Sequence, residues 1–167
     1  MRDNKAIFEL LDRLAIDYRM VEHEDVHTME DLLPIEAQLG AKFFRNLFLT
    51  NRNKSQLWLL LIIGDKPFRT SEVSHLLEVS RLSFGSAELL EEKLGVHPGA
   101  VNPLSLAFDR EHEIHLACDR EILQYKQVCM HPGSNGQSIV MNTEDLFEKI
   151  LPHLGITPRW IDITGEV

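Results

Sequence analysis

The sequence has few cysteines and lacks the signals that place a chain in a membrane or outside the cell. Its two cysteines, Cys118 and Cys129, form no CxxC pair, which argues against a disulfide framework and favours reduced, buried thiols. The longest apolar run, Leu57 to Ile63, has the length of a strand rather than of a membrane span. The N-terminus has no apolar signal-peptide segment. We therefore expect a cytoplasmic protein with no membrane partner.

Several familiar catalytic and cofactor motifs are also absent. The sequence contains no GxSxG, no GxxxxGK[ST] and no HExxH pattern, which argues against an elbow-type hydrolase, a phosphate-loop enzyme and a zinc helix. His112 and His115 flank Glu113 and Ile114 and are open to two interpretations. They could belong to a metal site or to a solvated turn, and the lack of a third ligand favours the turn.

The charge is predominantly acidic, with a net value of −9. This balance argues against a general nucleic-acid coat protein and against DNA as a partner, because phosphate binding needs a basic surface. The basic residues nevertheless gather locally, at Lys42, Arg45, Arg52 and Lys54, followed by Arg69 and Arg81. This asymmetry is compatible with a positively charged site entrance on an otherwise acidic protein, and also with charged residues scattered over the solvated surface.

The pattern of apolar residues predicts one α+β domain. A chain of 167 residues is large enough for one hydrophobic core, and no linker or repeat divides it. Apolar spacing and capping residues predict helices over 4–15, 28–40, 70–77, 87–94 and 143–154. Shorter apolar runs predict strands over 18–22, 44–50, 57–63, 81–84, 104–109, 113–118, 127–130, 138–141 and 159–163. We expect hairpins to join 44–50 to 57–63 and 104–109 to 113–118. The result is a mixed, mostly antiparallel sheet of about seven or eight strands, with helices packed on it.

Two loops carry most of the polar and conformationally special residues. The first follows the strand over 127–130 and contains His131, Asn135 and two glycines before Ser138. Glycines let a backbone approach a ligand and point its N–H groups at it. His131 either contributes to such a site or forms a structural hydrogen bond at a strand end. The second loop, residues 95–103, holds two prolines and two glycines and is either a shaped binding loop or a plain connector.

Taken in order along the chain, these pieces resemble the bacterial YbaK/ProX family of free-standing prolyl-tRNA editing proteins, and most closely its Ala-tRNA(Pro) deacylase branch. That family is related to the editing domain inserted in prolyl-tRNA synthetases. No single motif is decisive, but their order and spacing are specific. The matching segments are Arg45-Asn46-Leu47-Phe48-Leu49, Trp58-Leu59-Leu60, the segment 81–88, the segment 94–103, Met130-His131-Pro132 with Asn135, and Pro158-Arg159-Trp160-Ile161-Asp162.

The resemblance implies a deacylase that removes a wrong amino acid, most often alanine, from the terminal ribose of proline tRNA without a metal or cofactor. It implies that the whole chain, residues 1–167, is a single editing domain. It implies active-site roles for Arg45, Asn46 and His131, and contact between Arg81 and the acceptor stem. The implied amino-acid pocket is lined by Gly99, Ala100, Val101, Pro103, Asn135 and Ser138. The expected partners are the 3′ end of tRNA(Pro) and, as a candidate, prolyl-tRNA synthetase.

The chain departs from the family at its most characteristic position. The family usually has a lysine before Asn-Leu-Phe, whereas this chain has Arg45. Arginine keeps the positive charge, but its planar guanidinium is not interchangeable with a point-charge ammonium. Two hypotheses follow: a deacylase that works with arginine at this position, and a non-catalytic module of the same fold that senses an aminoacyl-tRNA end or a free amino acid.

Overall fold

A computed structural model describes residues 5–22, 29–130 and 137–166. The helices in this part of the chain are α1 (Lys5–Arg13), α2 (Met29–Leu39), α3 (Thr70–Leu77), α4 (Ala87–Leu94), α5 (Thr143–Asp145) and α6 (Leu151–His153), with 3₁₀ helices η1 (Pro98–Ala100), η2 (Pro103–Phe108) and η3 (Arg120–Gln124) and a π-helical turn, η4 (Leu146–Ile150). The strands are β1 (Tyr18–Glu22), β2 (Lys42–Thr50), β3 (Leu57–Ile63), β4 (Ser83–Phe84), β5 (Ile114–Asp119), β6 (Gln127–Met130), β7 (Gln137–Asn142) and β8 (Arg159–Ile161).

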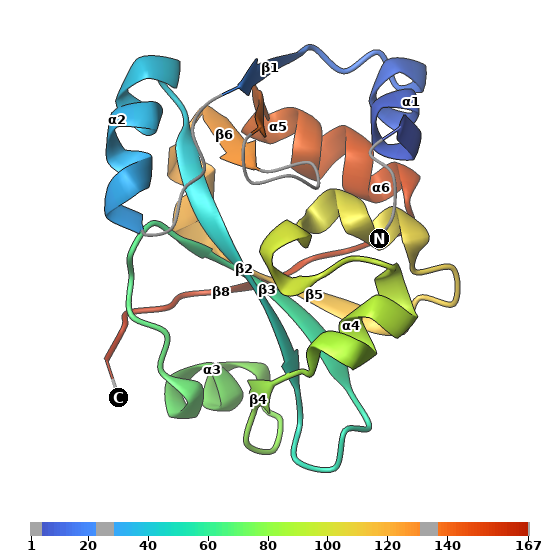
Figure 1. The fold of residues 1–167 in the computed structure, drawn as a ribbon. Helices are drawn as coiled ribbons and strands as arrows, with labels where there is room; N and C mark the ends of the chain where they lie inside the picture. The colour runs from blue at the N-terminus through green and yellow to red at the C-terminus, as the bar shows by residue number, and fades with distance from the viewer. Residues whose placement is uncertain (1–4, 23–28, 131–136, 167) are drawn as a thin grey trace.

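The described strands form one mixed sheet in the order β1-β7-β6-β2-β3-β5-β8, with β4 beside β2. The pairs β1–β7, β6–β7, β2–β3 and β2–β4 are antiparallel. The pairs β2–β6, β3–β5 and β5–β8 are parallel. The predicted α+β class and mostly antiparallel sheet are confirmed. The hairpin of β2 and β3 lies at the centre of the sheet (Figure 1), as expected from its nearly continuous apolar sequence.

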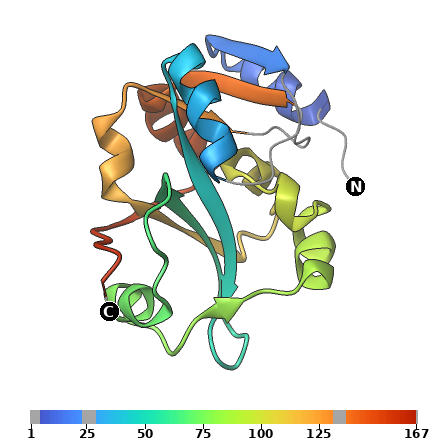
Figure 2. The ribbon, with the colours of Figure 1, turned by 60° about the vertical axis from the view of Figure 1, so that its left-hand side comes forward.

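Helices cover both faces of the sheet and separate its buried residues into clusters. One face, the main core, packs Phe44, Phe48 and Leu61 against α1, α4 and the segment around η4. The opposite face packs Leu49 and Ile62 against α3, and α2 covers a smaller cluster beside it. In Figure 2, α3 and α4 lie on opposite sides of β2. In the described residues, no helix is long and apolar enough to span a membrane.

The predicted hairpin of 104–109 with 113–118 is wrong. Residues 103–108 form the 3₁₀ helix η2, and β5 pairs in parallel with β3 and β8 instead. The local cause is a capping box, in which the Asn102 side chain accepts from the Leu104 N–H and Ser105 Oγ accepts from the Asn102 N–H. Pro103 at the first helical position fits this start. The apolar run of η2 packs into the main core as a helix, so its hydrophobicity did not mark a strand.

Candidate functional site

The central strand β2 lacks a strand partner along the middle of one edge. On that edge β6 pairs only with the first two residues of β2, and β4 only with the last two. On the other edge β3 pairs with β2 from Phe44 to Thr50. On the edge of β6 and β4, residues 44–48 therefore pair with no described strand.

Asn46 lies in the middle of this interrupted edge and faces the main core. It is paired in register with Leu61, and Phe44 and Phe48, two residues away on either side, are buried in the same cluster as Leu61. The Asn46 Oδ1 atom is buried and has no hydrogen-bond partner among the described residues. An orphaned buried acceptor costs about 1–3 kcal/mol. A bound molecule that donates a hydrogen bond to Oδ1 would remove that cost.

The loop after α4 is held rigidly against the same face. Ala100, Val101 and Pro103 are buried, and Val101 belongs to the cluster that contains Phe44 and Phe48. The Asn102 side chain is fully buried and its Oδ1 accepts from the Leu104 N–H at 2.8 Å. The capping box thus fixes the loop, and the structure brings it to the face that Asn46 occupies. Gly99 lies at its exposed end.

Arg45 points to the opposite face of the sheet, because successive side chains of a strand alternate. It is paired with Ile62, a residue of the cluster under α3. Its Nη2 group donates to the Lys66 carbonyl, and its Nε is buried without a partner among the described residues. Burial lowers the pKa of Arg45, and the charge of Asp65 opposes that shift. At the interrupted edge, the side chains of Arg45 and Asn46 therefore lie on opposite faces of the sheet.

The carbonyl that Arg45 contacts belongs to a well-anchored segment that the sequence did not single out. Lys66 Nζ lies 3.0 Å from Asp119 Oδ2 and 2.8 Å from the Ile163 carbonyl. Burial works to lower the pKa of Lys66, but the hydrogen bonds and charges of Asp119 and Glu121 outweigh it and raise the pKa. Asp119 also accepts from the Ile63 N–H. This network fixes the chain between β3 and α3.

The remaining predicted site residues are distributed differently. Ser138 is buried on β7, where it pairs with Val21 of β1. Arg81 is exposed and lines a hollow beside α3. His131 and Asn135 lie outside the described residues. The structure thus places Asn46 and the loop of Val101 on the same face of the sheet, and Arg45 and Arg81 on the side of α3.

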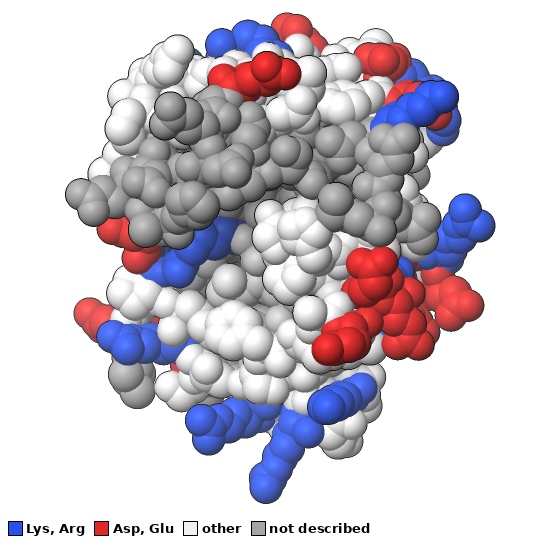
Figure 3. Space-filling model, in the orientation of Figure 1, with Lys and Arg blue, Asp and Glu red and all other residues white. Residues whose placement is uncertain are grey.

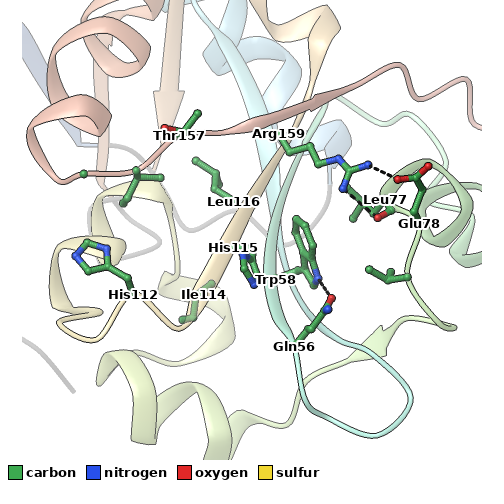
Figure 4. Close-up of a pocket in the computed structure, with 13 residues that line it drawn as sticks. Gln56, Trp58, Leu77, Glu78, His112, Ile114, His115, Leu116, Thr157 and Arg159 are labelled. Atoms are coloured by element: carbon green, nitrogen blue, oxygen red, sulfur yellow. Dashed lines mark hydrogen bonds and ion pairs between the residues drawn. The ribbon is translucent and has the colours of Figure 1, made fainter.

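A separate cavity of about 530 Å³ lies between β3, β5, β8 and the end of α3. Figure 4 shows Arg159 pointing to Leu77 and Glu78, and Gln56 beside the Trp58 ring, whose Nε1 group donates to it. Arg159 donates to the Leu77 carbonyl at 3.1 Å and lies 3.5 Å from a Glu78 carboxylate oxygen. The Trp58 ring packs on His115 with the ring centroids 4.8 Å apart. None of the predicted site residues lines this cavity, and the described residues contain no group of three or more side chains suited to a metal.

Comparisons with known proteins match almost the whole chain. The family model of the aminoacyl-tRNA editing domain matches residues 23–149. The prolyl-tRNA editing protein ProX of Acetoanaerobium sticklandii is 29% identical over 98% of this chain and 99% of its own length. Prolyl-tRNA synthetase associated domain-containing protein 1 of Danio rerio is 32% identical over 85% of this chain and 78% of its own length.

Solved structures show the same fold at low sequence identity. A candidate trans-editing enzyme for prolyl-tRNA synthetase superposes with a TM-score of 0.69 at 15% identity, covering 98% of this chain and 99% of that one. At this identity the similarity concerns the fold alone.

Proposed function

The chain belongs to the aminoacyl-tRNA editing domain family, and from this premise we propose that it is a trans-acting deacylase that hydrolyses mischarged tRNA(Pro), with Ala-tRNA(Pro) as its main substrate. We propose further that residues 1–167 act as one editing domain in the cytoplasm. The partner is the 3′ end of tRNA(Pro), and prolyl-tRNA synthetase is a candidate protein partner. Two relatives whose names refer to prolyl-tRNA editing or prolyl-tRNA synthetase support this proposal.

The observation that carries the proposal is the orphaned amide oxygen of Asn46 on the interrupted edge of β2. An aminoacyl ester brings two hydrogen-bond donors close to its reacting carbonyl, the α-ammonium group and the vicinal ribose hydroxyl. Either donor would satisfy Oδ1. Asn46 is therefore proposed to hold the substrate, with the loop of Gly99, Ala100, Val101 and Pro103 as the wall beside it.

An aminoacyl ester is already reactive, so the enzyme needs no serine or cysteine nucleophile. Water adds to the ester carbonyl, the bond to the ribose oxygen breaks, and that oxygen takes a proton, which yields the free amino acid and the intact tRNA. Fixing the water and the ester in one geometry and polarising the carbonyl lower the barrier. The vicinal hydroxyl of the ribose helps to orient the water. Arg45 is proposed to contact the terminal phosphate or ribose, Arg81 the acceptor stem, and His131, Asn135 and Ser138 the remaining sides of the pocket.

Selectivity is proposed to come from the size of the pocket. A synthetase site shaped for proline rejects a smaller amino acid weakly, because a missing methylene changes binding by only about 1–3 kcal/mol. A second site that is too small for proline corrects this error. Buried, tightly capped residues such as Val101 and Pro103 form a wall that cannot easily retreat to admit a larger side chain.

The deciding experiment is a deacylation panel with purified protein and tRNA(Pro) charged with alanine, cysteine, serine or proline. We expect rapid loss of alanine and little loss of proline relative to the uncatalysed rates. Arg45→Ala and His131→Ala are expected to lower the rate for alanine. Release of alanine no faster than in buffer would contradict the proposal.

The second candidate function is a non-catalytic sensor, and the position of Arg45 is the observation that favours it. Its Nη2 group is engaged with the Lys66 carbonyl, which limits its freedom to reach a substrate. A sensor would bind the aminoacyl-tRNA without turnover. An increase in the rate of alanine release in the Arg45→Lys variant would instead indicate an enzyme tuned at this position.

A further inference from the structure

A pair of aromatic rings, the exposed Phe84 and the partly buried Phe68, lies next to the interrupted edge of β2. The Phe84 side chain is 65% exposed, and its ring meets that of Phe68 edge-to-face with the centroids 5.7 Å apart. Large aromatic side chains are usually withdrawn from water, so an exposed aromatic surface is a signal of binding. Beside the pair lies a hollow of about 700 Å³, lined by Phe68, Arg69, Thr70, Ser71, Ser74 and Arg81. We name Phe68, Phe84, Arg69 and Arg81 together the aromatic–arginine surface.

The charge of the aromatic–arginine surface is positive, in contrast to that of the whole chain. Arg69 and Arg81 are both exposed, and the Arg69 Nε group donates to the Gly165 carbonyl, which steadies the side chain. The nearest acid on α3, Glu72, accepts hydrogen bonds from Thr164 and Gly165 and is thereby held toward the C-terminal segment. Figure 3 shows Lys and Arg side chains around β4 and the β2–β3 hairpin at the lower end of this face, whereas a large group of acidic side chains lies over α4.

The register of β4 on β2 relates this surface to the candidate site. Phe84 pairs with Leu49, which lies three residues along β2 from Asn46. Three residues of a strand span about 10 Å. Leu49 and Arg45 are four residues apart on β2 and therefore share a face of the sheet, whereas Asn46 faces the other way. Phe84, which pairs with Leu49, lies on the face that Arg45 occupies. Phe84 therefore lies about 10 Å along the sheet from the position of Asn46, on the other face of β2 and beside its interrupted edge.

We propose that the aromatic–arginine surface binds the single-stranded nucleotides that precede the aminoacylated one at the tRNA 3′ end. A base stacks on Phe84, which Phe68 supports, and the adjoining phosphates face Arg69. Surfaces that combine stacking aromatics with cationic side chains bind single-stranded nucleic acid with little sequence preference. The inference rests on the proposed function, and it explains how an acidic protein could hold an RNA end without a general basic coat.

The test compares Phe84→Ala with Phe84→Tyr, which keeps the stacking ring, and with Leu123→Ala, which removes another exposed hydrophobic side chain from η3. We expect Phe84→Ala to raise the KM for Ala-tRNA(Pro) about tenfold, as the loss of one stacked base implies. Phe84→Tyr and Leu123→Ala should leave KM close to that of the unchanged protein. Arg69→Gln should raise KM and reduce the dependence of KM on salt by about one unit of logarithmic slope.

A second measurement does not need catalysis. A short single-stranded RNA with the fluorescent base pyrrolocytosine next to its terminal adenosine should lose fluorescence when the base stacks on Phe84. We expect quenching with the unchanged protein and with Phe84→Tyr, and not with Phe84→Ala. Equal KM and equal quenching for Phe84→Ala and the unchanged protein would overturn the inference. Absence of deacylation with every aminoacyl-tRNA, accompanied by Phe84-dependent quenching, would overturn the proposed function alone.

Discussion

Replacing Asn46 with leucine is expected to make the protein more stable and inactive at the same time. Leucine branches at the same carbon as asparagine but has no acceptor to leave unpaired. Because the Asn46 Oδ1 atom is buried without a partner among the described residues, its removal relieves a cost of about 1–3 kcal/mol. For a chain of this length, 1 kcal/mol shifts the melting temperature by about 2–4 °C. We therefore expect a rise of at least that size and loss of alanine release.

The chain offers a matched control for this prediction. Asn102 is also buried, but its Oδ1 accepts from the Leu104 N–H and its Nδ2 group donates to the Ala100 carbonyl. Asn102→Leu breaks the capping box and should destabilise the fold by about 1–3 kcal/mol. Thermal unfolding of the two variants side by side gives opposite signs if the reasoning is right. Destabilisation of Asn46→Leu as large as that of Asn102→Leu would refute it, because it would mean that the Asn46 amide is satisfied in solution.

Further predictions concern packing, pH and thiol chemistry. A methyl group at Gly85 would lie 2.4 Å from the Phe48 ring, so Gly85→Ala should lower the free energy of unfolding by about 1–3 kcal/mol, measured by denaturant. A methyl group at Gly99 meets only His97, at 3.4 Å, so Gly99→Ala should keep the stability of the unchanged protein. Equal stabilities of the two variants would contradict this. Burial works to raise the pKa of Glu72, but hydrogen bonds from Thr164 and Gly165 lower it overall. Its stabilising contribution is complete above the ordinary glutamate pKa and is lost as the pH falls below it, so the acid-induced loss of stability should shrink in Glu72→Gln. Burial raises the pKa of both cysteine thiols, so a thiol reagent should label them only after unfolding, and rapid labelling of the native protein would contradict the structure.

Local sequence patterns predicted most elements, because caps and apolar periodicity act over a few residues. The helix over 87–94 is confirmed, with Ser86 accepting from the Leu89 N–H and Gly95 in the left-handed region at its end. The hairpin of β2 and β3 is confirmed for the same reason. The error at residues 104–109 arose because an apolar run is compatible with a strand or with a buried short helix. The capping box of Asn102 and Ser105, which spans four residues, is the local feature that favours the helix.

The candidate site was less predictable, because it depends on pairing between distant segments. The alternation of a strand places Arg45 and Asn46 on opposite faces, and this follows from the sequence. Which face holds the binding loop does not, since it depends on α4 and η2 packing against the main core. Nor does local sequence show that β6 leaves β2 after Phe43. The anchoring of Lys66 by Asp119 joins residues 53 positions apart and carries no local signal.

The strand order also determines when the site can exist during synthesis of the chain. β1 from the beginning of the chain pairs with β7, and β2 pairs with β6, which is made more than seventy residues later. Non-local pairings of this kind form slowly, because the entropy cost of closing a long loop arises before the stabilising contacts between its ends can form. Asn46 emerges early within a local hairpin, whereas β6, which bounds its edge, comes from the last third of the chain. A truncated or nascent chain would therefore contain the residue without the rest of the candidate site, which is complete only once β6 and β7 have joined the sheet.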